Sequence, residues 1–362
     1  MKKLLSLALS ISTALAILPG VSACGEKNGT DNQVSQIQNV IVVIGDGMGE
    51  NHILNAIDYF DLDTPTFIQD QTGYIGTNSL SGTTDSAAGG TALATGRKVV
   101  NGNVAQLQGK DLEQITTIAQ AAGMKTGVVT TDTLDGATPA SFSAHANNRG
   151  ATAQIVNTQA TSGIDLMLGR FSSEYTNRSS LFKGQNYTLV TDEESLLQSK
   201  EAEKLIGVLP HIDSQYILGN ETDFQLHEMT EFAIDYLEND NGFFLMIEGA
   251  YIDKHSHSNR FHDAMSETRS LIDTIEYLYE YASDGKTAIF ITADHETGGL
   301  QRTMEDSAPG NHLYTCGDHT PTPVPLFIKN YAFHAERFGY SEGETPENTV
   351  VFEACKSIIT KK

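Results

Sequence analysis

The chain alternates short runs of apolar, β-branched residues with longer segments of helical periodicity, and this alternation limits the folds open to it. Five apolar runs predict strands: Val40–Ile44, Thr126–Thr131, Phe243–Ile247, Thr287–Thr292 and Val324–Ile328. Helices are predicted over Leu112–Ala122, Phe224–Glu238 and His262–Ala282. Strands that are apolar on both faces and alternate with helices form parallel sheets that helices cover on both sides. The sequence therefore predicts an α/β fold with a mostly parallel central sheet.

The first 24 residues have the features of an export signal. Lys2 and Lys3 precede the apolar run Leu4–Leu18, and Val21–Cys24 resembles a bacterial lipobox with Cys24 as the lipidated residue. An ordinary secretory cleavage is the alternative. We expect an exported protein, periplasmic or at the cell surface and held to a membrane only through a lipid on Cys24.

Beyond this leader we expect a flexible tether and one folded domain. Residues 25–38 are rich in Gly, Ser and Asn, which predicts the tether. Residues 39–362 are predicted to form a single domain, in which the less periodic stretch Asn157–Asn220 lies at the periphery. Outside the cytoplasm Cys316 and Cys355 could pair or remain free thiols, and their spacing does not decide between the two.

The formal net charge of −23 argues against nucleic acid or an anionic lipid surface as a partner. It does not exclude a phosphate substrate, because carboxylates that hold metal ions reverse the local field.

Acidic, threonine and histidine residues follow the predicted strands. They are Asp46, Thr138, Glu248, Asp294 and His295. Ligands of open α/β sheets bind outside the carboxyl ends of the strands, so these residues should converge on one edge of the sheet. For Asp46 alone, within Gly45–Gly49, an ordinary glycine-rich turn is the alternative.

The segment Glu248–His257 is the densest cluster of candidate ligands. Asp253 and His257 are four residues apart, so at the start of a helix they share one face and suit one zinc ion. Glu248 would face a different ion. His255 competes with His257, and spacing alone does not decide. His319 follows 24 residues after His295, either as a further ligand or as a lone loop histidine. Mixed Asp and His suit Zn²⁺, whereas oxygen ligands suit Mg²⁺ or Ca²⁺.

Ser86 and Arg149 are the candidates for chemistry on a phosphoryl group. Ser86 opens a helix of small residues, Ser86–Thr95, as an N-cap or as a nucleophile. No Gly-x-Ser-x-Gly elbow surrounds it, so activation by a metal is the more economical route. Arg149 is either a surface arginine or a planar fork for two phosphate oxygens.

Together these motifs resemble the alkaline phosphatase family. The resemblance runs from Val40 to Ile328 and rests on Asp-Ser-Ala-Ala, Thr-Pro-Ala with an Arg eleven residues after the Thr, Glu-Gly-x-x-Ile-Asp-Lys and Thr-Ala-Asp-His-Glu-Thr. It implies a three-layer sandwich and metal-dependent hydrolysis of small phosphate monoesters to an alcohol and inorganic phosphate. Ser86 would become a phosphoserine, Arg149 would grip the phosphoryl group, and Lys254 matches the lysine of some bacterial members.

The resemblance also implies two Zn²⁺ and one Mg²⁺. The implied ligands are Asp253, His257 and His319 for one zinc, Asp46, Asp294 and His295 for the other, and Asp46, Thr138 and Glu248 for magnesium.

Two departures from the family pattern qualify these expectations. Gly136 stands where relatives often carry an Asp or His that supports the third metal, which predicts weaker magnesium binding and an altered Lys254. The short connection from His295 to His319 predicts a more open site and leaves a homodimer open.

The alternatives are a phosphodiesterase or sulfatase of the same superfamily, and a non-catalytic lipoprotein that binds phosphate or metal. Thr138 and Glu248 argue against a diesterase. The sulfatase motif is absent around Ser86.

Overall fold

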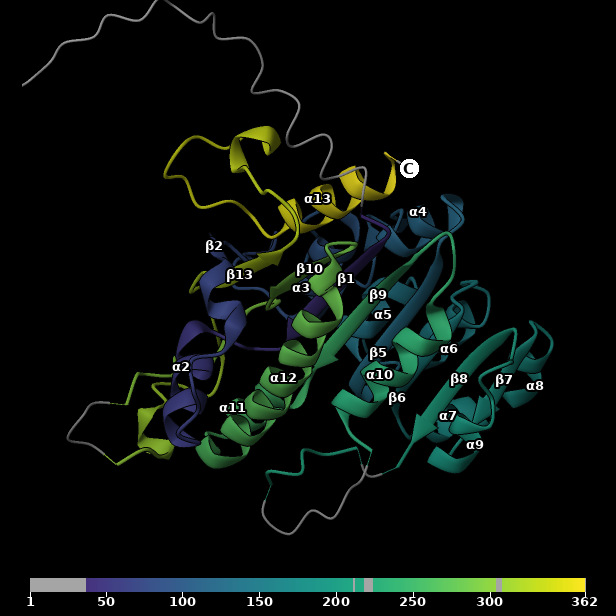
Figure 1. The fold of residues 1–362 in the computed structure, drawn as a ribbon, viewed down its shortest axis with the longest axis horizontal. Coiled ribbons are helices and arrows are strands. Elements are labelled where there is room, and N and C mark those ends of the chain that lie inside the picture. Colours follow the sequence, from purple (N-terminus) through teal and green to yellow (C-terminus); the bar gives the residue numbers. More distant parts are fainter. Residues whose placement is uncertain (1–36, 211, 218–223, 304–307, 362) are drawn as a thin grey trace, which may run out of the picture.

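The computed structural model describes residues 37–210, 212–217, 224–303 and 308–361 (Figure 1). The predicted export signal and most of the predicted tether lie outside the described residues. Among the helices of the described part, none combines the length and the apolar character needed to cross a membrane.

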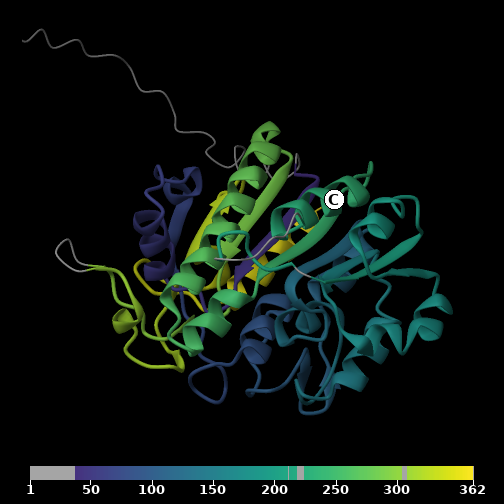
Figure 2. The ribbon, with the colours of Figure 1, turned by 90° about the horizontal axis from the view of Figure 1, so that it is seen from below.

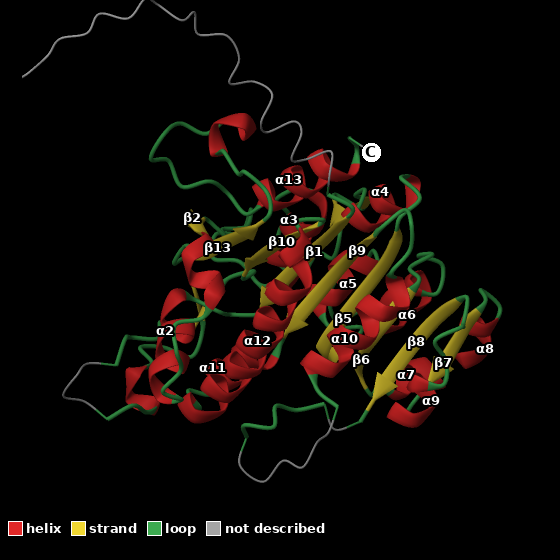
Figure 3. Ribbon diagram, viewed as in Figure 1, coloured by secondary structure: helices red, strands yellow, loops and turns green. Residues whose placement is uncertain are grey.

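One large sheet organises the fold (Figure 3). Its strands are β1 (Asn39–Gly45), β2 (Gln71–Ile75), β5 (Lys125–Thr133), β6 (Leu166–Arg170), β7 (Tyr187–Val190), β8 (Lys204–Leu209), β9 (Phe243–Gly249), β10 (Thr287–Thr292) and β13 (Val324–Lys329). Their order is β2-β13-β10-β1-β9-β5-β6-β8-β7. Every pairing is parallel except those of β13, which runs antiparallel to both β10 and β2. The predicted mostly parallel α/β sheet is confirmed.

Helices cover both faces of the sheet (Figure 2). On one face lie α10 (Leu226–Leu237) and α12 (Phe261–Tyr281), with α2 (Glu50–Tyr59) and α11 (Tyr251–His257) packed against α12. On the other lie α3 (Ser86–Thr95), α4 (Ile115–Ala121), α5 (Ala137–Ser143) and α13 (Thr349–Ile359). This double cover explains why all seven residues of β1 and of β9 are buried. Burying one Val, Ile or Phe side chain contributes roughly 1.5–3 kcal/mol.

The remaining elements are short. They are α6 (Thr152–Gln159), α7 (Ser173–Thr176), α8 (Ser179–Lys183), α9 (Glu193–Leu197), the hairpin β3–β4 (Gln106–Leu107, Lys110–Asp111), the pair β11–β12 (Glu296–Thr297, His319–Thr320), and 3₁₀ turns at Thr66–Asp70, Ala282–Asp284, Asn311–Leu313 and Ala335–Phe338.

The region predicted as peripheral contributes more than expected. Residues 157–220 contain β6, β7 and β8, which extend the parallel sheet on one side. Glycines inside two of these strands weakened the sequence signal. A Cβ at Gly169 would lie 2.9 Å from Asp132 O, and one at Gly207 would lie 2.7 Å from Leu168 Cδ2. Close packing therefore favours glycine at these two positions, and glycine is the residue that weakened the prediction of these strands.

Candidate active site

The ends of three adjacent strands bring the acidic residues together. Asp46 follows β1 directly, and Ile44 in β1 is in register with Glu248 of β9 and Thr292 of β10. Asp294 comes two residues after β10, and its Oδ1 accepts a hydrogen bond from Gly47 N at 3.2 Å. The predicted convergence on one edge of the sheet is what the structure shows. Two positions differ in detail from the prediction, because Glu248 lies within β9 and Thr138 lies in α5.

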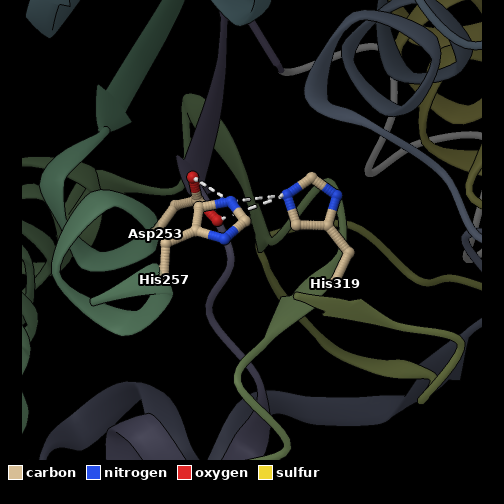
Figure 4. A group of neighbouring side chains, drawn as sticks. All are labelled: Asp253, His257 and His319. Carbon is tan, nitrogen blue, oxygen red and sulfur yellow. Dashed lines mark hydrogen bonds and ion pairs between the residues drawn. The ribbon is translucent and has the colours of Figure 1, made fainter. Parts of the chain in front are cut away.

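Asp253, His257 and His319 form a first cluster (Figure 4). Asp253 and His257 lie on α11, and His257 Nε2 is 3.4 Å from Asp253 Oδ2. His319 Nε2, from β12, is 3.5 Å from Asp253 Oδ1 and 3.0 Å from His257 Nε2. His255 is not part of this cluster, and within the described part of the chain its buried Nε2 has no hydrogen-bond partner. The choice between the two histidines, which spacing left open, falls to His257.

Backbone carbonyls fix how both imidazoles of this cluster are protonated. Gly317 O lies 2.7 Å from His257 Nδ1, and Thr84 O lies 2.7 Å from His319 Nδ1. A carbonyl can only accept, so each Nδ1 donates its proton, and in the neutral rings each Nε2 presents a lone pair. These lone pairs face each other and a carboxylate. That arrangement is unfavourable by itself and suits a cation held between them.

A second cluster surrounds Ser86. His295 Nε2 lies 3.3 Å from Ser86 Oγ, 3.3 Å from Asp294 Oδ2 and 3.5 Å from Asp46 Oδ1. These two carboxylate oxygens, Asp294 Oδ2 and Asp46 Oδ1, are buried and have no hydrogen-bond partner among the residues that the structure describes. Buried polar atoms are normally paired, so unpaired oxygens that converge on one point fit a metal ion. The donor types in both clusters, imidazole and carboxylate, are those that Zn²⁺ prefers.

The third predicted site is less complete. Glu248 is adjacent to Asp46 through the pairing of β1 with β9, and it accepts a short hydrogen bond from Thr130 Oγ1. Thr138 Oγ1 is buried without a partner, so no hydrogen bond in the described part of the chain joins it to Asp46 or Glu248. Oxygen donors of this kind fit Mg²⁺.

The buried carboxylates perturb one another's pKa. Burial and the nearby charges of Asp294, Asp253 and Glu248 raise the pKa of Asp46 well above its usual value. Burial, and the charge of Asp132, raise the pKa of Glu248 to about 8. For Asp253, burial acts in the same direction, but the contacts with His319, His295 and Thr297 outweigh it and lower its pKa. An excess of buried negative charge is what bound cations would relieve.

Ser86 is the first residue of α3 and is not its N-cap. Asp85 holds that position and accepts a hydrogen bond from Ala88 N at 3.0 Å. The capping interpretation of Ser86 is therefore wrong, and its hydroxyl is left beside His295. The small residues of α3 allow the helix to pack closely against the loop that carries Asp294 and His295. A Cβ at Gly89 would lie 2.8 Å from Asp294 O.

Arg149 and Lys254 are both held by aspartates. Arg149 NH1 lies 3.3 Å from Asp85 Oδ2, which places the guanidinium next to the start of α3. Lys254 Nζ donates to Asp132 Oδ1 and lies 4.4 Å from the centre of the Tyr251 ring. Burial lowers the pKa of Lys254, but the charge of Asp132 outweighs it and raises the pKa overall.

The acidic partner that Gly136 appeared to remove is supplied by Asp132. A Cβ at Gly136 would lie 2.6 Å from Asp132 Oδ2, so the Asp132 carboxylate occupies the space beside this glycine. Lys254 therefore has an acidic partner despite Gly136, and the expected weaker binding of magnesium stays a prediction. Sequence analysis missed Asp132 because only the fold brings it to Lys254, although its place near the end of β5 was a usable signal. Within the described residues, Cys316 and Cys355 form no disulfide.

Clusters of candidate metal ligands around a buried serine, at the carboxyl ends of parallel strands, are typical of metal-dependent hydrolases of the α/β class. The profile of the family described as alkaline phosphatase matches residues 37–168 and 172–353. The chain therefore belongs to the alkaline phosphatase family, as the resemblance of its motifs predicted. Its activity is the hydrolysis of phosphate esters.

Individual relatives agree with this assignment. The chain is similar to alkaline phosphatase 4 of Bacillus subtilis, with 33% identity over 322 residues that cover 81% of this chain and 70% of the relative. It is 28% identical to alkaline phosphatase of Escherichia coli over 86% of this chain and 79% of the relative. The solved structure of alkaline phosphatase from the Antarctic bacterium TAB5 has 30% identity and a TM-score of 0.75, over 90% of this chain and 98% of that one. A mutant of the same enzyme has Mg bound in its M3 site.

Proposed function

We propose that this protein hydrolyses phosphate monoesters to an alcohol and inorganic phosphate through a covalent phosphoserine on Ser86. The observation that carries the proposal is the position of the Ser86 hydroxyl, 3.3 Å from His295 Nε2 and at the start of α3. Asp46 and Asp294, each with a buried oxygen that lacks a partner, lie beside the same imidazole. The first turn of a helix also favours negative charge, by roughly 0.3–1 kcal/mol.

The cofactors in this proposal are two Zn²⁺ and one Mg²⁺. Asp253, His257 and His319 would hold one zinc, Asp46, Asp294 and His295 the other, and Asp46, Thr138 and Glu248 the magnesium. When bound, these ions lower the pKa of a coordinated hydroxyl and stabilise charge on attacking and leaving oxygens. Magnesium in the M3 site of a mutant of the TAB5 enzyme supports the third assignment.

The residues of the chain then have separate roles. Ser86 Oγ attacks phosphorus, the bond to the alcohol oxygen breaks, and the alcohol leaves with a proton. Water next attacks the phosphoserine, which releases inorganic phosphate and restores the serine hydroxyl. Asp85 occupies NH1 of Arg149, so the remaining N–H donors are left for the equatorial phosphoryl oxygens. Lys254 adds positive charge towards the substrate.

The test compares an aryl phosphate monoester with the corresponding diester, in the wild-type protein and in Ser86→Ala. Ser179→Ala is the matched control, because Ser179 is also the first residue of a helix but lies on α8, which packs against the edge strand β7. We expect the monoester to be the better substrate, Ser86→Ala to lose nearly all turnover, and the control to keep it. Faster turnover of the diester would favour a phosphodiesterase, and phosphate binding without turnover would favour a non-catalytic protein.

For the location of the protein we propose export and a lipid on Cys24. Metabolic labelling with a fatty acid in wild type and Cys24→Ser tests this. Label that depends on Cys24 supports the anchor, whereas an unlabelled, secreted protein supports ordinary cleavage.

A further inference from the structure

One buried hydroxyl contacts residues of both clusters of candidate metal ligands. Thr297 lies in β11 and is fully buried. Its Oγ1 is 2.5 Å from Asp253 Oδ1 in the first cluster and 3.2 Å from His295 Nδ1 in the second. Sequence analysis assigned this threonine no role.

The chemistry of the three groups sets the direction of both hydrogen bonds. An ionised carboxylate only accepts, so Thr297 gives its single proton to Asp253. Towards His295 the threonine oxygen can then only accept, which requires the proton of the neutral ring to be on Nδ1. The lone pair of His295 is therefore on Nε2, the atom that faces Ser86 Oγ at 3.3 Å.

The backbone of Thr297 reaches the other parts of the site. Its N–H donates to Gly47 O at 3.0 Å, and the residue pairs with His319 across β11–β12. Gly47 has φ of +73°, and a Cβ there would lie 2.7 Å from Thr297 Oγ1. The loop that carries Asp46 is thus fitted closely around this hydroxyl.

We propose that Thr297 is a positioning residue that holds His295 in its Nδ1–H tautomer and couples the two sites for divalent cations. Loss of its hydroxyl frees the Asp253 carboxylate in one site and the His295 ring in the other, so one substitution weakens both. The identity of the cation rests on the proposed function.

The first experiment titrates metal-free protein with Zn²⁺ against a competing chelator. Thr297→Val removes the hydroxyl at nearly constant volume, and Thr297→Ser keeps it. Thr268→Val is the matched control, because the Thr268 hydroxyl is equally buried but, among the described residues, donates to Ala264 O within its own helix α12. We expect Thr297→Val to lose roughly 10–100-fold in affinity at both sites, the typical cost of losing a group that orients a ligand. We expect Thr297→Ser and the control to stay within a few-fold of wild type.

The second experiment reads the tautomer of His295 by ¹⁵N–¹H correlation in metal-free wild type, so it does not depend on whether the valine variant folds. We expect a proton on Nδ1. A proton on Nε2, equal zinc affinities in wild type and Thr297→Val, or a loss confined to one site would overturn the proposal for Thr297. Wild-type protein that binds no zinc at all would overturn the proposed cofactors instead. The measured tautomer of His295 would then still test the role of Thr297.

Discussion

His257 Nε2 and His319 Nε2 face each other at 3.0 Å while both Nδ1 atoms are engaged by backbone carbonyls. Neither ring can turn its proton towards the other without giving up a hydrogen bond to the backbone. The Asp253 carboxylate stands beside both rings. This geometry is stable when a cation lies among the three groups, and it is the reason to expect stability to depend on metal.

Removal of metal should lower the thermal midpoint of unfolding, because without cations the carboxylate oxygens and imidazole lone pairs of the two clusters repel one another. A ligand that binds only the folded state at 100 times its Kd contributes about 2.7 kcal/mol. We expect a chelator to lower Tm in calorimetry and added Zn²⁺ to restore it, with a much smaller response in His319→Asn. An unchanged Tm after verified removal of metal would contradict this expectation.

Substitution of Asp132 by Asn should change how the site holds phosphate. The carboxylate neutralises Lys254, so its loss leaves the lysine free to pair with the anion. We expect inhibition by inorganic phosphate to tighten by about tenfold, which corresponds to about 1.4 kcal/mol. Asp213→Asn is the control, because it breaks the ion pair of Arg170, the other cation over the Tyr251 ring. Equal inhibition constants in wild type and Asp132→Asn would show that Lys254 does not reach phosphate.

Gly89→Ala should impair both activity and stability. In a helix this change normally stabilises by up to about 1 kcal/mol. Here the added Cβ would meet Asp294 O at 2.8 Å and push α3 away from the Asp294 loop, at a cost of roughly 1–3 kcal/mol. We expect at least a tenfold drop in kcat/KM, measured with an aryl phosphate. Gly184→Ala has room for its Cβ and should behave like wild type, and equal behaviour of the two variants would argue against this tight packing.

Glu267 should make the protein less stable as pH rises towards neutrality. Burial raises its pKa from 4.5 to about 7, partly offset by the hydrogen bond from Ser214 N. Between these values the unfolded chain loses the proton that the folded protein keeps, so stability falls with rising pH and levels off above 7. At about 1.4 kcal/mol per pKa unit the loss is about 3 kcal/mol.

Urea unfolding at pH 5 and pH 8 measures this effect in wild type, in Glu267→Gln and in Glu280→Gln, an exposed control on the same helix. The Glu267 variant should gain stability relative to wild type at pH 8 more than at pH 5. If the difference in stability between Glu267→Gln and wild type is the same at pH 5 and pH 8, Glu267 is not the source of the pH dependence.

Sequence periodicity located the strands that build the site, because β1, β9 and β10 are apolar along nearly their whole length. It could not give the direction of β13, since a short apolar run has the same pattern in a parallel or an antiparallel pair. It also missed β6 and β8, where close packing demands glycine.

For the site, the motifs predicted which side chains converge but not how they are held. Spacing alone did not separate His255 from His257, although only the residue one turn after Asp253 joins its cluster. Asp132 and Thr297 were missed because their roles depend on contacts across the sheet, with Lys254 in one case and with Asp253 and His295 in the other.

Trapping the covalent intermediate is the most direct test of the account. The protein is incubated with an aryl phosphate, quenched in acid during turnover, digested and analysed by mass spectrometry. The account predicts phosphate on the peptide that contains Ser86, and none on that peptide in Ser86→Ala. Full turnover of the monoester with Ser86 unmodified at every quench time would contradict it.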